Sequence, residues 1–138
     1  MEMKKRGPLE GIRILDLSTV IAAPFGATLL ADFGADVIKV EMPNVGDPLR
    51  NLGPYYEGEG LRWPGIARNK KSLTLDLRQE EGKEILRELV KKSDMIIENF
   101  RTGTLEKWGG WLRGIKRNQS RLSHDSCDGL RTNRTVCT

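Results

Sequence analysis

The sequence has few residues suited to metal binding or redox chemistry. It contains two cysteines and one histidine in 138 residues. All three, His124, Cys127 and Cys137, lie near the end of the chain. Four ligands at zinc-site spacing are absent, and two cysteines in a cytosolic chain are usually free thiols. We therefore expect no metal site.

A long hydrophobic run is also missing. No stretch approaches the roughly 18 consecutive apolar residues that a membrane-spanning helix needs. The opening MEMKKRGPLEG has basic residues but no apolar segment of the kind that a secretory signal requires. We expect a cytoplasmic protein without a membrane partner.

Most of the chain lacks an excess of either charge sign. The formal net charge is +4, yet residues 1–109 hold 17 basic and 17 acidic side chains. Residues 110–138 hold six basic side chains against two acidic ones. This tail has no aromatic residue beyond Trp111 and no nucleic-acid-binding motif, so we expect no nucleic-acid partner.

The first 109 residues alternate between strand patterns and helix patterns. Short apolar or alternating runs predict four strands, at residues 12–17, 37–41, 73–77 and 94–100. Residues 22–35 and 78–93 predict helices. Strand, helix, strand order with short connections favours parallel strands. The predicted fold class is α/β, the N-terminal part of a Rossmann-like, mostly parallel, doubly wound sheet domain.

Residues 42–71 interrupt this alternation. The segment is rich in Gly, Pro, Asn and aromatic residues, and a structureless stretch of this length is uncommon and often functional. Tyr55, Tyr56 and Trp63 are expected either to cover a ligand or to pack the loop onto the sheet.

The turn after the first predicted strand excludes one large class of α/β enzymes. Its sequence, STVIAAPFGA, lacks the closely spaced glycines that admit a pyrophosphate. A nicotinamide- or flavin-dependent enzyme is therefore not expected.

Several phrases together resemble family III CoA-transferases of the CaiB/BaiF type. They are PLEGIRILDLSTVIAAPFG, LLADFGADVIKVEMPNVGDPLR, ARNKKSLTLDLRQEEGKEILRELV and DMIIENFRTGTLEKWG. The phrases follow the family's order and cover residues 8–109, with Thr102 standing where the family commonly has proline. This group includes formyl-CoA, carnitine-CoA and succinyl-CoA-dependent enzymes and the related 2-methylacyl-CoA racemases.

The resemblance implies that coenzyme A or an acyl-CoA binds as a substrate, with a carboxylic acid as the other substrate and no permanently bound cofactor. It also implies that full-length members are interlocked homodimers. The CoA contacts that it implies fall on Val20, Ile21, Ala22, Lys39, Leu75, Asn99, Phe100, Arg101 and Lys107. The cations among them suit the phosphates of CoA. For the two lysines a solvated surface position is an equal alternative.

In the resembled family an aspartate attacks the thioester, and it lies downstream of the last matching phrase. We therefore expect this chain to lack a catalytic residue and to be inactive by itself. Asp16, Asp76 and Glu98 lie in or at the ends of predicted strands, where structural roles are expected. A racemase relative and a non-catalytic, poorly folding fragment remain alternatives.

The sequence after Gly109 stops resembling the family. When the codons of RTNRTVC are read one nucleotide later, a permitted choice spells GQTGPYA, which is similar to a family phrase from this region. We therefore expect a frame change near Gly109 or Gly110. On this hypothesis residues 1–109 are the N-terminal part of the family domain, and residues 110–138 are a non-native, disordered tail.

Overall fold

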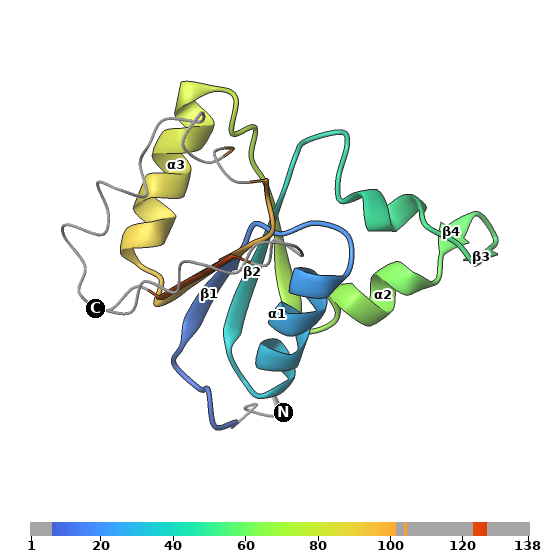
Figure 1. The fold of residues 1–138 in the computed structure, drawn as a ribbon, viewed down its shortest axis with the longest axis horizontal. Coiled ribbons are helices and arrows are strands. Elements are labelled where there is room, and N and C mark those ends of the chain that lie inside the picture. Colours follow the sequence, from blue (N-terminus) through green and yellow to red (C-terminus); the bar gives the residue numbers. More distant parts are fainter. Residues whose placement is uncertain (1–6, 102–103, 105–122, 127–138) are drawn as a thin grey trace, which may run out of the picture.

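A parallel sheet lies at the centre of the computed structural model, in which residues 7–101, 104 and 123–126 are described (Figure 1). Its strand order is β5-β2-β1-β6-β7, and every neighbouring pair is parallel. The strands are β1 (Arg13–Asp16), β2 (Asp36–Glu41), β5 (Lys70–Thr74), β6 (Met95–Glu98) and β7 (Ser123–Ser126).

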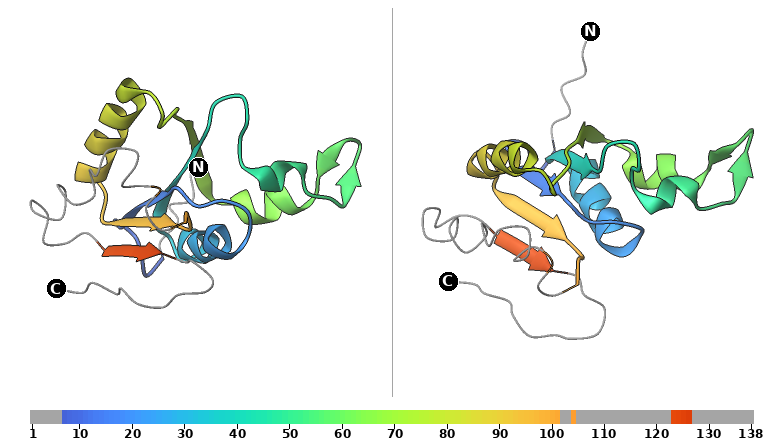
Figure 2. Two further views of the ribbon diagram at one scale, coloured as in Figure 1. Left: turned by 45° about the horizontal axis from the view of Figure 1, so that its top comes forward. Right: turned by 90° about the horizontal axis from the view of Figure 1, so that it is seen from above.

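Two helices cover opposite faces of this sheet, as Figures 1 and 2 show. Helix α1 (Ala22–Asp32) packs small side chains such as Ala27 against Ile14 and Ile97. Helix α3 (Glu80–Lys91) packs Leu86 and Val90 on the other face, against Leu15 and Ile96 among others. Successive strand residues alternate between the two cores because side chains alternate along a strand. The predicted α/β fold with a mostly parallel sheet is confirmed.

The predicted helices are also confirmed, with slightly earlier ends. In α1, Pro24 lies in the first turn, and Gly34 follows the helix with a φ of 101°. In α3, Glu80 and Glu81 occupy the first turn and Lys91 the last, which suits the helix dipole.

The third predicted strand, residues 73–77, is three residues too late, because β5 spans Lys70–Thr74. Strand β5 begins with two lysines, so its first half does not show the apolar alternation that predicts a strand. Lys70 points inward to Asp16, and Thr74 is the last residue in register with β2. The Leu75 N–H still donates to the Glu41 carbonyl, at 2.9 Å, before the chain turns away.

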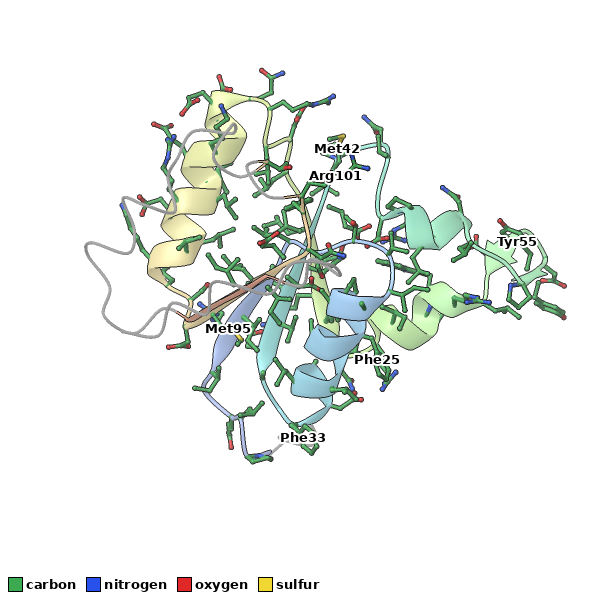
Figure 3. The ribbon with its side chains drawn as sticks, in the orientation of Figure 1. Phe25, Phe33, Met42, Tyr55, Met95 and Arg101 are labelled. Carbon is green, nitrogen blue, oxygen red and sulfur yellow. The ribbon has the colours of Figure 1, made fainter. Side chains whose placement is uncertain are left out.

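The segment predicted as structureless, residues 42–71, is an ordered arm. It contains the 3-10 turn η1 (Pro48–Asn51), the hairpin strands β3 (Tyr55–Tyr56) and β4 (Glu59–Gly60), and helix α2 (Arg62–Ala67). Tyr55 lies at the far end of this arm, and both tyrosines are exposed (Figure 3). The Trp63 ring lies 3.9 Å from the Arg50 guanidinium carbon, so this indole packs the arm on itself.

Four residues of the tail expected to be disordered form a strand instead. Strand β7 pairs with β6 over Met95–Glu98, whose other edge pairs with β1. An open sheet edge offers backbone N–H and C=O groups to any extended segment, whatever its side chains. Within the described residues, no helix is long and apolar enough to cross a membrane.

Candidate functional site

The loop between β1 and α1 is held at the carboxyl end of the sheet by three side chains from other elements. The Asn99 side-chain amide accepts from the Thr19 N–H and donates to the Thr19 carbonyl. The Asp47 carboxylate accepts from the Val20 N–H at 3.0 Å. The Lys39 ammonium donates to the Ser18 carbonyl. Ligands of open parallel sheets bind at this edge, so the loop occupies the expected position for a binding site.

A cluster of four buried charges lies beneath this loop. Lys39 Nζ is 3.1 Å from Asp47 Oδ2 and 3.7 Å from Asp16 Oδ1, and Lys70 Nζ is 2.8 Å from Asp16 Oδ2. The four side chains are at most 3% exposed. Burial lowers the pKa of Lys70, and the Asp16 carboxylate partly offsets this effect. Two cations and two anions balance, which is the condition under which buried charges are tolerated.

A second charged pair holds the start of the arm against β2. Glu41 accepts two bonds from the Arg50 guanidinium, at 2.8 and 2.9 Å, and one from the Asp47 N–H at 2.9 Å. Burial raises the pKa of Glu41, but these bonds outweigh burial and hold the pKa below its ordinary value of 4.5. The pair therefore fixes where Asp47 enters the buried charge cluster.

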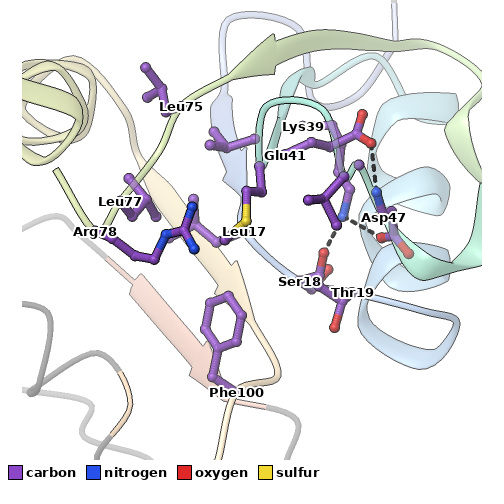
Figure 4. A pocket seen from close by; sticks show the side chains of 14 residues that line it. Leu17, Ser18, Thr19, Lys39, Glu41, Asp47, Leu75, Leu77, Arg78 and Phe100 are labelled. Atoms are coloured by element: carbon purple, nitrogen blue, oxygen red, sulfur yellow. Dashed lines mark hydrogen bonds and ion pairs between the residues drawn. The ribbon is translucent and has the colours of Figure 1, made fainter.

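An open, mainly apolar pocket lies beside these groups, at the carboxyl ends of β1, β2, β5 and β6 (Figure 4). Aliphatic and aromatic side chains dominate its wall, and charged groups lie at one end and at the mouth. The lining consists of Leu17, Ser18, Thr19, Lys39, Val40, Glu41, Met42, Val45, Gly46, Asp47, Leu75, Leu77, Arg78 and Phe100. Such a wall suits an extended, partly apolar ligand with polar ends.

The structure brings part of the predicted site together. Lys39, Leu75 and Phe100 line the pocket, and Asn99 binds the Thr19 peptide at its edge. Val20, Ile21 and Ala22 are exposed at the start of α1, directly after the lining residues Ser18 and Thr19. Arg101 is exposed and is not part of the lining, and Lys107 lies outside the described residues.

The environment of Lys39 differs from the solvated surface position that the sequence left open. Its side chain is 3% exposed and lies among two carboxylates and a carbonyl oxygen. The solvated alternative is wrong because strand β2 lies between β1 and β5 and its Lys39 faces Asp16 across the sheet.

Arg78 is a pocket cation that the sequence analysis missed. Its guanidinium bonds Asp76 at 2.9 and 3.0 Å, and its side chain is 62% exposed at the pocket mouth. The hydrogen bond from Arg78 lowers the pKa of Asp76. The position of Arg78 in the sequence could have identified it, because an arginine directly after the third predicted strand lies at the same sheet edge as the other candidate residues.

Each carboxylate for which a structural role was predicted has a partner. Asp16 bonds Ser18 and pairs with Lys70, and Asp76 accepts from Arg78. Glu98 accepts a hydrogen bond from the backbone N–H of Phe100, at 2.7 Å. Among the described residues there is no cluster of three or more side chains that could hold a metal ion.

Comparisons with known proteins extend over most of the chain. The sequence profile of CoA-transferase family III matches residues 9–122. The chain is 56% identical, over 106 residues, to succinyl-CoA–D-citramalate CoA-transferase of Chloroflexus aurantiacus, covering 75% of this chain and 26% of that protein. It is 37% identical, over 127 residues, to acetyl-CoA:oxalate CoA-transferase of Acetobacter aceti, covering 92% and 33%.

Solved structures agree with these matches. A CaiB/BaiF family protein from Brucella suis superposes with a TM-score of 0.79 at 38% identity, covering 88% of this chain and 33% of that one. The chain therefore spans about a quarter to a third of the length of the relatives it matches.

Proposed function

Because the chain belongs to CoA-transferase family III, we propose that its pocket binds the CoA part of an acyl-CoA. The observation that carries this proposal is the position of the pocket, at the carboxyl edge of the parallel sheet beside the β1–α1 loop. Its apolar wall suits the pantetheine arm. The exposed Arg78 guanidinium at the mouth suits a phosphate group.

We propose further that the whole enzyme exchanges CoA between an acyl-CoA and a carboxylic acid through an enzyme aspartate outside the matched segment. The two carboxylates that line the pocket, those of Glu41 and Asp47, are each paired with a cation. Glu41 is bound by Arg50, and Asp47 is paired with Lys39. A buried carboxylate held by a cation is a poor nucleophile, so this chain is expected to bind CoA without transferring it.

The relatives named above are CoA-transferases, which favours transfer over the racemase alternative. The two activities differ in chemistry, because transfer forms a new thioester on a second acid, whereas a racemase moves a proton beside the thioester carbonyl. Assays of a frame-restored chain for CoA exchange and for epimerisation of a 2-methylacyl-CoA distinguish them.

Titration of the 138-residue chain with CoA in a calorimeter tests the binding proposal. We expect Arg78→Ala to weaken binding about tenfold, because it removes a cation facing the ligand's phosphates. Arg87→Ala is the matched control, since Arg87 also pairs with a carboxylate but lies on α3. Equal losses in the two variants, or no binding by the unsubstituted chain, would contradict the proposal.

We also propose that residues from about 110 onward come from a shifted reading frame. Relatives that are 56% and 58% identical match only 106 residues of this chain, which supports a break near Gly109. More distant relatives align over 127 and 134 residues, so the boundary needs a direct test. Sequencing the coding DNA across Gly109 and Gly110 provides it, and an intact frame followed by a homologous tail would refute the hypothesis.

A further inference from the structure

Asn99 makes two hydrogen bonds to the backbone of Thr19, a residue 80 positions away in the sequence. Its Oδ1 accepts from the Thr19 N–H at 2.8 Å, and its Nδ2 donates to the Thr19 carbonyl at 2.8 Å. The side-chain amide therefore pairs with the backbone as a neighbouring strand would. This position is one residue beyond the end of β6, where the strand ladder no longer supplies partners for the loop.

The residue after Thr19 has an unfavourable backbone conformation. Val20 has a φ of 69°, in the left-handed region that a β-branched residue rarely adopts. Such a conformation persists only where the surrounding structure imposes it. The Val20 N–H donates to Asp47 Oδ1 at 3.0 Å, so Asn99 and Asp47 together hold both peptide units that flank Thr19.

The turn decides how the pocket meets helix α1. Ser18 and Thr19 belong to the pocket wall, and the chain enters α1 three residues after Thr19, at Ala22. A change of Val20 to a negative φ would redirect both the Thr19 peptide and the start of the helix. The shape of this side of the pocket therefore depends on the bonds that keep Val20 left-handed.

We infer that Asn99 is a positioning residue, which sets the affinity of the pocket for CoA by holding the Thr19–Val20 turn and not by contacting the ligand. The identification of CoA as the ligand rests on the proposed function. The hold on the turn is a property of the ligand-free chain and can be measured separately. The Asn99 side chain bonds both the N–H and the C=O of Thr19, so its removal would act on the ligand through the backbone of the turn.

A double substitution separates positioning from contact. Glycine adopts a positive φ without strain, so a Val20→Gly chain retains the turn even when Asn99 is removed. We expect Asn99→Ala to weaken CoA binding about tenfold in the original background and less than about threefold in the Val20→Gly background. Equal losses in the two backgrounds would indicate direct contact and overturn the inference.

Amide hydrogen exchange tests the turn without a ligand. We expect Asn99→Ala to accelerate exchange of the Thr19 N–H strongly and that of the Val20 N–H less, while the N–H of Leu15 in the core strand β1 is unchanged. Uniform acceleration, including Leu15, would show a general loss of stability, and an unchanged Thr19 rate would refute the hold on the turn. Asn51→Ala, at an exposed asparagine on η1, should alter none of these three exchange rates.

A second variant covers the case in which Asn99→Ala does not fold. Asn99→Asp keeps the acceptor for the Thr19 N–H but sets a carboxylate oxygen against the Thr19 carbonyl, so weaker CoA binding with a smaller exchange change is expected. Unchanged CoA binding in this variant would also overturn the inference. If the unsubstituted chain binds no CoA, the proposed function fails, while the exchange experiment still decides whether Asn99 holds the turn.

Discussion

Replacing Lys39 with methionine should destabilise the chain strongly. The ammonium group lies 3.1 Å from Asp47 Oδ2 and 3.7 Å from Asp16 Oδ1, and it also donates to the Ser18 carbonyl. The side chains of Asp16 and Asp47 are at most 1% exposed, so solvent cannot replace the lost cation. Without Lys39, the four-charge cluster changes from neutral to a net charge of −1.

The magnitude follows from the cost of an uncompensated buried charge, which is about 3–5 kcal/mol when one partner of a buried pair is removed. Domains of this size are stable by about 5–15 kcal/mol, so this loss should lower the urea concentration at the unfolding midpoint by a large fraction of its original value. A double variant, Lys39→Met with Asp47→Asn, removes both charges and keeps Oδ1 as an acceptor for the Val20 and Leu49 N–H groups. It should recover about 1–3 kcal/mol of the loss.

The measurement is urea unfolding followed by circular dichroism at neutral pH. Lys71→Met is the matched control, because Lys71 lies on β5, the strand next to β2, and pairs with Asp36, but its side chain is 70% exposed. Its substitution should cost about 0–1 kcal/mol. A cost for Lys39→Met no larger than that for Lys71→Met would refute the assignment of Lys39 to a buried charge cluster. A normal midpoint combined with a large loss of CoA affinity would instead identify Lys39 as a ligand contact.

Three further outcomes are expected from the same unfolding assay. The ion pair holds the folded-state pKa of Glu41 below 4.5, so its contribution is fully present above about pH 4.5 and is lost as pH falls through the folded-state value. Glu41→Gln should therefore lower stability at pH 7 and flatten the decline in acid, and an unchanged slope would argue against the pair. Leu86→Ala should cost about 2–5 kcal/mol because the residue is 1% exposed in the core, whereas Ile85→Ala, at 49% exposed, should cost about 0.5 kcal/mol or less; similar losses would contradict the assigned packing of α3. Gly34→Ala should destabilise by at least about 1–2 kcal/mol, since its φ is 101° and a Cβ would lie 2.9 Å from the Gly7 Cα, while Gly26→Ala should stabilise α1 by about 0.5–1 kcal/mol; a tolerated Gly34 substitution would contradict this backbone geometry.

Much of the fold was predictable because its signals are local. Apolar runs marked β1, β2 and β6, and the charge pattern from Glu80 to Lys91 marked α3. Strand β5 was displaced because its first residues are lysines, and the inward orientation of Lys70 depends on Asp16, which is 54 residues away. The hairpin and helix of the arm were missed because glycine, proline and aromatic residues suggested a loop.

The candidate site was predicted as a region and not as a set of contacts. The sheet edge followed from strand order, and Leu75 and Phe100 do line the pocket. The exposed cation at its mouth, Arg78, was missed. A residue's exposure depends on which elements cover it, and no local pattern records that.

The sequence by itself determined the class of fold, the family and the sheet edge at which the pocket lies, because periodicity and motif order are written along the chain. Only the tertiary structure decided the state of individual groups. It buried Lys39 between two carboxylates, and it joined Asn99 to Thr19 across 80 residues. The free energy of a charge or a strained turn depends on neighbours in space, and the backbone brings those neighbours together only when the sheet has formed.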